Sequence, residues 1–169
     1  MMRILFFITF FVAKLFCLDL NFTNFSSDFI QSVSSKNSKI NYSGHFVLTQ
    51  NKAFWSYEKP TRKEIYINKN QITIVEHDLE QVIFSTLDTI PNLNEIFKSA
   101  KKIRPNELEA KYQNINYKIL LENDEVKSIG YKDEFENYVL ITLLKQSKNT
   151  KLDENIFIPK FPKNYDLVR

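Results

Sequence analysis

The chain is poor in the residues from which many enzyme sites are built. Its 169 residues include only two glycines, two histidines and one cysteine. Gly44 and Gly130 stand far apart, which excludes a glycine-rich loop that would hold a nucleotide phosphate. His45 and His77 lack the spacings of zinc sites and of catalytic triads. We therefore expect no catalytic residue, no metal and no cofactor, and we predict that the protein is not an enzyme.

Arginine is also scarce, with Arg3, Arg62, Arg104 and Arg169 as its only occurrences. Arginine is the side chain best suited to bidentate binding of phosphate or carboxylate, so phosphate ligands are disfavoured. The formal charge is +3, and removal of Arg3 and Lys14 with an N-terminal segment leaves 21 basic against 20 acidic residues. A balance this even gives no electrostatic basis for binding nucleic acid.

Residues 1–18 are predicted to be a signal peptide. A basic residue near the start precedes a mostly apolar run from Ile4 to Phe16, about 13 residues long and too short to span a bilayer. We place cleavage near Cys17 or Leu18, which leaves residues 19–169 as one exported domain. A lipoprotein signal is disfavoured, because a bulky phenylalanine precedes the cysteine where a small residue is expected.

With its one cysteine in or beside the signal peptide, the domain has no disulfide and must be held by packing. Residues for packing are abundant, since 43% of the chain is hydrophobic and 14% aromatic, with 15 Phe and 8 Tyr. Aromatic residues favour half-buried strands, and the length suits one domain. The composition therefore predicts a mainly β domain.

Alternation of apolar and polar residues predicts ten strands. The clearest is residues 39–49, where Tyr42, Phe46 and Leu48 share one face and His45 lies on the other. The remaining candidates are residues 28–33, 53–59, 64–67, 71–75, 79–86, 115–121, 126–131, 138–144 and 156–158. Short turns between them predict an antiparallel meander.

One segment changes to helical spacing. Leu93, Ile96 and Phe97 recur three and four residues apart, which predicts an amphipathic helix over residues 93–102 with its lysines outside. Residues 104–111 fit either an extension of this helix or another strand. Ten antiparallel strands interrupted by one helix are typical of a strongly curved sheet with the helix packed across its concave face.

Alternation also assigns faces to the aromatic segment that follows Asn51. Ala53, Trp55 and Tyr57 share one face, which we place on the concave side, and Phe54 lies on the other. One short helix covers little of a concave sheet, so an apolar hollow is predicted, of a kind that suits a lipid or an acyl chain. The alternative is an aromatic core that fills the same space.

Five short segments stand in a characteristic order: F-I-Q at 29–31, Y-S-G at 42–44, W-S-Y-E-K-P at 55–60, D-L-E-Q-V at 78–82 and F-I-P at 157–159. In this order they resemble the LolA family, periplasmic proteins that carry lipoproteins from the inner to the outer membrane of Gram-negative bacteria. The resemblance implies an unclosed β-barrel with a short helical lid over its concave face, and a carrier that makes and breaks no bond.

The resemblance also implies a ligand and partners. Acyl chains of lipoproteins would bind in the concave cavity, for which the candidate residues are Trp55, Tyr57, Leu93, Ile96 and Phe97. An ATP-driven inner-membrane complex would release the cargo to this carrier, and an outer-membrane lipoprotein acceptor would receive it. The carrier itself would be a periplasmic monomer. Typical members place an arginine shortly before the tryptophan strand to latch the lid, and residues 49–51 offer no counterpart.

Two other functions stay open from the sequence alone. A non-enzymatic interaction protein of the cell envelope would use the same aromatic residues as a filled core. A hydrolase would use His77 with a nearby carboxylate, but Glu76, Asp78 and Glu80 place this histidine in a predicted solvated turn.

Overall fold

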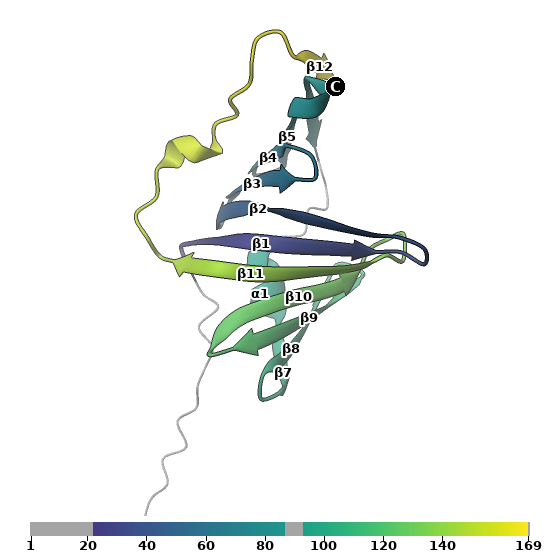
Figure 1. Cartoon of the computed structure of the whole chain (residues 1–169). Coiled ribbons are helices and arrows are strands. Elements are labelled where there is room, and N and C mark those ends of the chain that lie inside the picture. The colour runs from purple at the N-terminus through teal and green to yellow at the C-terminus, as the bar shows by residue number, and fades with distance from the viewer. Residues whose placement is uncertain (1–21, 87–92, 169) are drawn as a thin grey trace, which may run out of the picture.

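Twelve strands and one α-helix make up the computed structural model, which describes residues 22–86 and 93–168 (Figure 1). The predicted signal peptide lies outside the described residues. The first half holds β1 (Asn24–Ser34), β2 (Lys39–Thr49), β3 (Lys52–Lys59), β4 (Lys63–Asn68), β5 (Gln71–Glu76), the 3₁₀ helix η1 (His77–Leu79) and β6 (Gln81–Thr86). The second half holds α1 (Leu93–Ser99), β7 (Lys101–Arg104), β8 (Glu107–Tyr112), β9 (Ile115–Glu122), β10 (Glu125–Lys132), β11 (Tyr138–Lys148), the 3₁₀ helix η2 (Glu154–Phe157) and β12 (Asp166–Val168).

All twelve strands form one sheet in the order β12-β6-β5-β4-β3-β2-β1-β11-β10-β9-β8-β7. Every pair is antiparallel except β12 with β6. Because β12 and β7 are the two edges, the sheet does not close on itself. This confirms the predicted mainly β fold with an unclosed, curved sheet and a short helix over its concave face. Within the described residues, no helix is long and apolar enough to cross a membrane.

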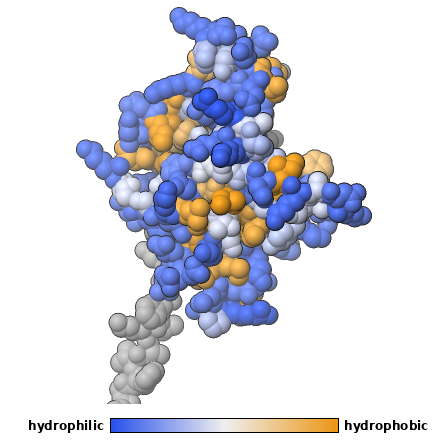
Figure 2. Space-filling model, viewed as in Figure 1, coloured by the Kyte–Doolittle hydropathy of each residue, from blue (hydrophilic) through white to orange (hydrophobic). Residues whose placement is uncertain are grey.

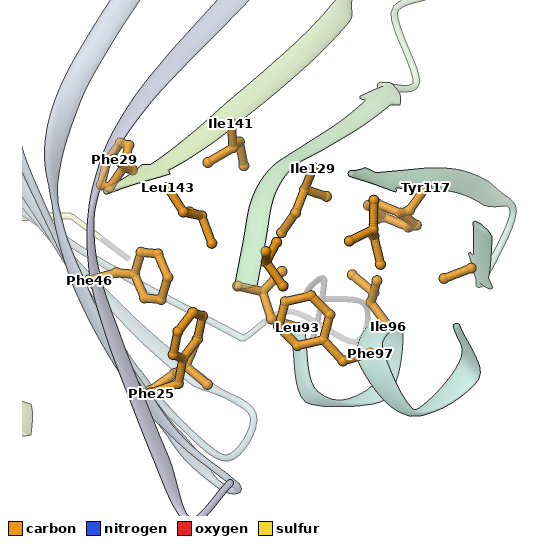
Figure 3. Packing of buried hydrophobic residues seen from close by; sticks show 14 of the residues in the cluster. Phe25, Phe29, Phe46, Leu93, Ile96, Phe97, Tyr117, Ile129, Ile141 and Leu143 are labelled. Atoms are coloured by element: carbon orange, nitrogen blue, oxygen red, sulfur yellow. The ribbon is translucent and has the colours of Figure 1, made fainter. Parts of the chain in front are cut away.

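The concave face carries the main core. Phe25 and Phe29 of β1 and Phe46 of β2 are almost fully buried, and they point into the same core as the helix residues Ile96 and Phe97 (Figure 3). The phenylalanine rings of β1 and β2 meet at centroid distances of 5.5 and 6.3 Å. Burying side chains of this size contributes about 1.5 to 3 kcal/mol each, so this seam is the main source of stability without a disulfide.

Two irregularities bend the central strands. In β1 the register with β11 shifts between Ser26 and Asp28, and the Ser27 hydroxyl accepts a hydrogen bond from the Leu144 amide at 3.1 Å. The side chain of Ser27 therefore satisfies a backbone group that the bulge leaves unpaired, and the residue is fully buried. Bulges increase local twist, which here helps β1 and its neighbours wrap around the helix.

The second irregularity lies in β2, where the register with β3 shifts between Ser43 and Gly44. A Cβ atom at Gly44 would lie 1.9 Å from the Ser56 carbonyl oxygen of β3. Only glycine allows the two backbones to come this close. Gly44 is also the residue paired with Phe29 on one side and Tyr57 on the other, and these two rings meet at 5.1 Å.

The chain after β11 forms a strap across the outer face of the sheet, as the yellow segment of Figure 1 shows. Phe157 of η2 is buried, and Phe161 and Tyr165 pack against a second cluster. That cluster consists of Phe54, Tyr66, Val75 and Val82. The strap ends as β12, where the Asp166 amide donates to the Glu80 carbonyl at 2.8 Å. In this view β1 and β11 lie in front of α1, and hydrophilic residues cover most of the face shown in Figure 2.

Several element boundaries predicted from the sequence are wrong. The helix ends at Ser99, and Lys101 and Lys102 lie on β7 because this segment pairs with β8 through the Pro105 turn. Of the undecided residues 104–111, Arg104 ends β7, residues 105–106 form the turn, and residues 107–111 belong to β8. The strand predicted over 79–86 begins only at Gln81, after η1.

The strand predicted over residues 156–158 is also wrong, because η2 occupies most of this segment. The Asp153 carboxylate accepts a hydrogen bond from the Asn155 amide at 3.0 Å, which caps the turn. Alternation in so short a segment does not distinguish a strand from a capped turn.

We predict that Gly44→Ala lowers the free energy of unfolding by about 2 kcal/mol or more, because the added methyl group meets backbone that cannot move away. Gly130→Ala is the matched control. Its Cβ would meet the Tyr138 hydroxyl at 2.7 Å, the far end of a half-exposed side chain that can rotate, so we expect a loss below about 1 kcal/mol. Urea unfolding of both variants measures this, and equal losses would contradict it.

The strap gives a second prediction. Phe157→Ala should lower the free energy of unfolding by about 3 kcal/mol, because the ring is only 7% exposed. Ile158→Ala, at the next residue, removes a side chain that is 54% exposed and should change it by less than about 0.5 kcal/mol. Thermal unfolding followed by circular dichroism compares the two, and a strap that adds no stability would show no difference.

Candidate functional site

A cavity of about 540 Å³ lies on the concave face beside the aromatic core. Its walls come from β3, β4 and β5 on one side, from α1, and from β8, β9, β10 and β11 on the other. Ala53 and Trp55 of β3 and Leu93 and Ile96 of α1 are among the lining residues. A hollow therefore exists where the sequence predicted one, and the aromatic residues fill only part of the concave face.

The structure brings four of the five predicted acyl-binding residues to this cavity. Trp55, Tyr57, Leu93 and Ile96 line it. Phe97 points elsewhere, since its ring packs against Phe22 and Phe25 at 6.1 and 6.3 Å. The role of Phe97 in binding stays a prediction, and its contacts indicate that it fixes the helix to the sheet. The predicted concave position of Ala53, Trp55 and Tyr57 is confirmed, and Phe54 lies in the cluster on the opposite face.

Trp55 stands at the boundary between the core and the cavity. Its ring contacts Phe46 at 4.5 Å and Phe29 at 5.3 Å, while the side chain also lines the hollow. Because two phenylalanines hold the indole, its orientation is fixed by packing. The sequence contains one tryptophan, so its fluorescence reports on this cavity alone.

Four isoleucines form an aliphatic wall that the sequence interpretation did not single out. They are Ile65 and Ile67 of β4 and Ile72 and Ile74 of β5. Ile65 pairs with Ile74 and Ile67 with Ile72 across the two strands. The signal was present in the sequence, because Ile65 and Ile67 alternate in step with the inward residues of β3.

The turns at one end of the cavity make its rim polar. Gln50 and Asn51 belong to the β2–β3 turn, and Lys69 and Asn70 to the β4–β5 turn. The Lys69 amide donates to the Asn51 carbonyl at 2.9 Å, which ties the two turns together. Lys52 forms an ion pair with Glu154 of η2 at 2.6 Å. A polar rim around an apolar interior suits a ligand that has an apolar chain and a polar head.

Away from this rim, the cavity lining contains the phenol groups of three tyrosines. Tyr57 donates a hydrogen bond to the Gln31 side-chain oxygen at 3.1 Å, and the rings of Tyr117 and Tyr131 meet at 5.0 Å. Burial raises the pKa of Tyr57 and of Tyr131, and it raises the pKa of Tyr117 to about 12. These phenols therefore stay protonated at neutral pH and can donate hydrogen bonds.

Both histidines lie outside the cavity lining. The Asp28 carboxylate is 2.8 Å from His45 Nδ1 and 3.1 Å from the Lys145 ammonium, and these two contacts lower the pKa of Asp28. His77 Nδ1 lies 3.1 Å from the Tyr165 hydroxyl of the strap. The expectation of a solvated turn is wrong for His77 itself, because its side chain is only 19% exposed. In the described part of the chain, no group of three or more His, Cys, Asp or Glu residues is placed to hold a metal.

Comparison with known proteins gives a consistent result. Residues 21–98 match the family described as outer membrane lipoprotein carrier protein LolA. A Campylobacter jejuni protein named outer-membrane lipoprotein carrier protein is 62% identical, over 94% of this chain and 94% of its own length. Proteins of that name from Helicobacter pylori and Wolinella succinogenes are 29% and 30% identical, over 88% and 86% of this chain and 82% and 87% of their own lengths.

Solved structures show the same fold at low sequence identity. An uncharacterized conserved protein from Thermus thermophilus superposes with a TM-score of 0.55 at 12% identity, over 87% of this chain and 90% of that one. A LolA superfamily protein from Nitrosomonas europaea gives a TM-score of 0.51 at 9% identity, over 80% and 90%. At these identities the likeness concerns the fold alone.

The raised pKa of Tyr117 predicts a loss of stability at alkaline pH. The unfolded chain releases the phenol proton near pH 10, whereas the folded protein keeps it to about pH 12, so the stabilisation is complete below pH 10 and is lost as the pH rises. Between these pH values the free energy of unfolding should fall by about 1 to 2 kcal/mol less in Tyr117→Phe than in the wild type, because the variant has no phenol to titrate at this position. Urea titrations at pH 9 and pH 11.5 measure it, and parallel declines in both proteins would contradict it.

Proposed function

The chain belongs to the LolA family of outer membrane lipoprotein carrier proteins, and on this premise we propose that its concave cavity covers the acyl chains of lipoproteins during transport. The observation that carries the proposal is the cavity of about 540 Å³ with an apolar interior and a polar rim. The acyl-binding residues we propose are Trp55, Tyr57, Leu93 and Ile96. Phe97 would support them indirectly, because its packing fixes the helix to the sheet.

The energetics of an acyl chain support this assignment. Burying a methylene group contributes about 0.8 kcal/mol, so an exposed sixteen-carbon chain represents about 12 kcal/mol of driving force toward aggregation or membrane insertion. A carrier must cover such a chain and still release it. The isoleucine wall meets both needs, because aliphatic contacts are numerous, weak and without fixed direction.

Transport of this kind needs no bond to be made or broken, and we propose that the protein acts without catalysis. Energy for loading would have to come from outside the chain, since its two isolated glycines cannot form a nucleotide-binding loop. We therefore assign the supply of cargo to an ATP-driven inner-membrane complex and its reception to an outer-membrane acceptor. The protein would act as a periplasmic monomer after removal of residues 1–18.

Trp55 provides the test. A synthetic diacylated lipopeptide with bromine atoms on its acyl chains should quench Trp55 fluorescence saturably, because bromine quenches an indole at close range and the indole lines the cavity. The same lipopeptide without bromine should bind without quenching in this way. A titration in which the brominated lipopeptide leaves the fluorescence unchanged would contradict the proposal.

Filling the cavity should prevent this binding. Ala53→Phe places a ring among the lining residues and should weaken lipopeptide binding at least tenfold by removing space for the chain. Ser56→Phe adds the same bulk to the same strand, but its side chain lies on the opposite face, so binding should change less than twofold. Equal loss in both variants would point to a folding defect and would leave the cavity without a demonstrated role.

A further inference from the structure

A polar side chain occupies the floor of the apolar cavity. Gln31 lies on the central strand β1 in step with Phe29 and Val33, both of which belong to the core. It is half-buried and lines the cavity. An amide that is removed from water is destabilising unless its hydrogen bonds are made, so a ligand that fills the cavity must satisfy this one. The position therefore calls for an explanation beyond packing.

Only part of this amide is satisfied by the protein. The Gln31 oxygen accepts the Tyr57 hydroxyl at 3.1 Å. The amide nitrogen donates to no group within residues 22–86 and 93–168. Because Tyr57 fixes the oxygen, the amide nitrogen stays available as a donor when a ligand displaces water from the cavity.

Two further donors lie on the opposite wall. Tyr117 of β9 and Tyr131 of β10 are cross-strand partners, and both line the cavity. Tyr117 is 2% exposed, and in the part of the chain that the structure describes its hydroxyl has no hydrogen-bond partner. Tyr57, on the strand that faces them, lines the same cavity. A hydroxyl without a partner is available to donate to a ligand atom that comes within reach.

The absence of charge on these three donors indicates which kind of ligand atom they would bind. Gln31, Tyr117 and Tyr131 are all neutral donors. The lysines of the cavity lining, Lys52 and Lys69, belong to the polar rim, and the Lys63 ammonium, 5.2 Å from the centroid of the Tyr57 ring, is not part of the lining. A carboxylate or phosphate placed among neutral donors in an apolar cavity would be poorly stabilised. A neutral carbonyl oxygen accepts two hydrogen bonds without this penalty.

We propose that Gln31, Tyr117 and Tyr131 form a subsite that binds the ester or amide carbonyl through which an acyl chain is attached to its head group. The inference rests on the proposed function, since it concerns the same cavity. The chain beyond the carbonyl then extends along Trp55 and the isoleucine wall. Recognition of the linkage lets the carrier distinguish an acylated ligand from a hydrocarbon or a free fatty acid.

The test compares ligands that differ only in the carbonyl group. Dioctanoylglycerol has two ester carbonyls, and 1,2-di-O-octylglycerol has ether links in their place. Wild-type protein should bind the ester about 3 to 10 times more tightly by Trp55 fluorescence, as expected for one or two net hydrogen bonds. The double variant Tyr117→Phe/Tyr131→Phe should lose most of the preference for the ester and should bind the ether as the wild type does, because only the Gln31 donor remains. A diacylated cysteinyl peptide, which represents a lipoprotein source, should lose the same factor.

The controls separate the possible failures. Tyr138→Phe, on a half-exposed ring outside the cavity lining, should leave both affinities unchanged. Thermal unfolding should show no loss of stability in Tyr117→Phe, because the hydroxyl that it removes is unpaired. Equal wild-type affinity for ester and ether would overturn the subsite alone. Tighter binding of octanoate than of the ester would overturn it in favour of a charged site at Lys63. If neither lipid binds, the proposed function itself fails.

Discussion

The close approach of β2 and β3 at Gly44 is the constraint on which the rest of the structure depends. It brings the strand that carries Phe46 against the strand that carries Trp55, and it leaves room for Phe29 and Tyr57 to meet above the glycine. Together with the bulge at Ser27, it bends the middle of the sheet around α1. A flat sheet of the same strands would expose these rings and would have no concave side.

This curvature divides the concave face into two parts with different packing. On the side of β1 and β2, aromatic rings interlock and fix the helix. On the side of β4 and β5, isoleucines line the cavity. A rigid core and an adaptable wall therefore lie next to each other, and Trp55 belongs to both. Such a division lets a carrier keep its fold while the occupant of the cavity changes.

Much of this arrangement could be predicted from the sequence. Strict alternation identified β2 to the residue and placed Trp55 and Tyr57 on the concave side, because period two is unambiguous in a long strand with one buried face. The predicted helix contains all of α1, but its predicted end was wrong, because Lys101 and Lys102 are compatible with both states and only pairing with β8 decides between them. The strap was not predicted, because its contacts with β5 and β6 join residues that are far apart in the sequence.

The subsite at Gln31 depends on which strands face each other across the cavity, and periodicity along one strand carries no such information.

The central claim is that the cavity covers the acyl chains of lipoproteins. Its most direct test is native mass spectrometry of the protein purified from the cell envelope without stripping of bound lipid. The account predicts complexes with acylated proteins in the wild type and their loss in Ala53→Phe, while Ser56→Phe retains them. Recovery of only unacylated partners, bound equally by both variants, would contradict the account and would favour an interaction protein with no ligand in its cavity.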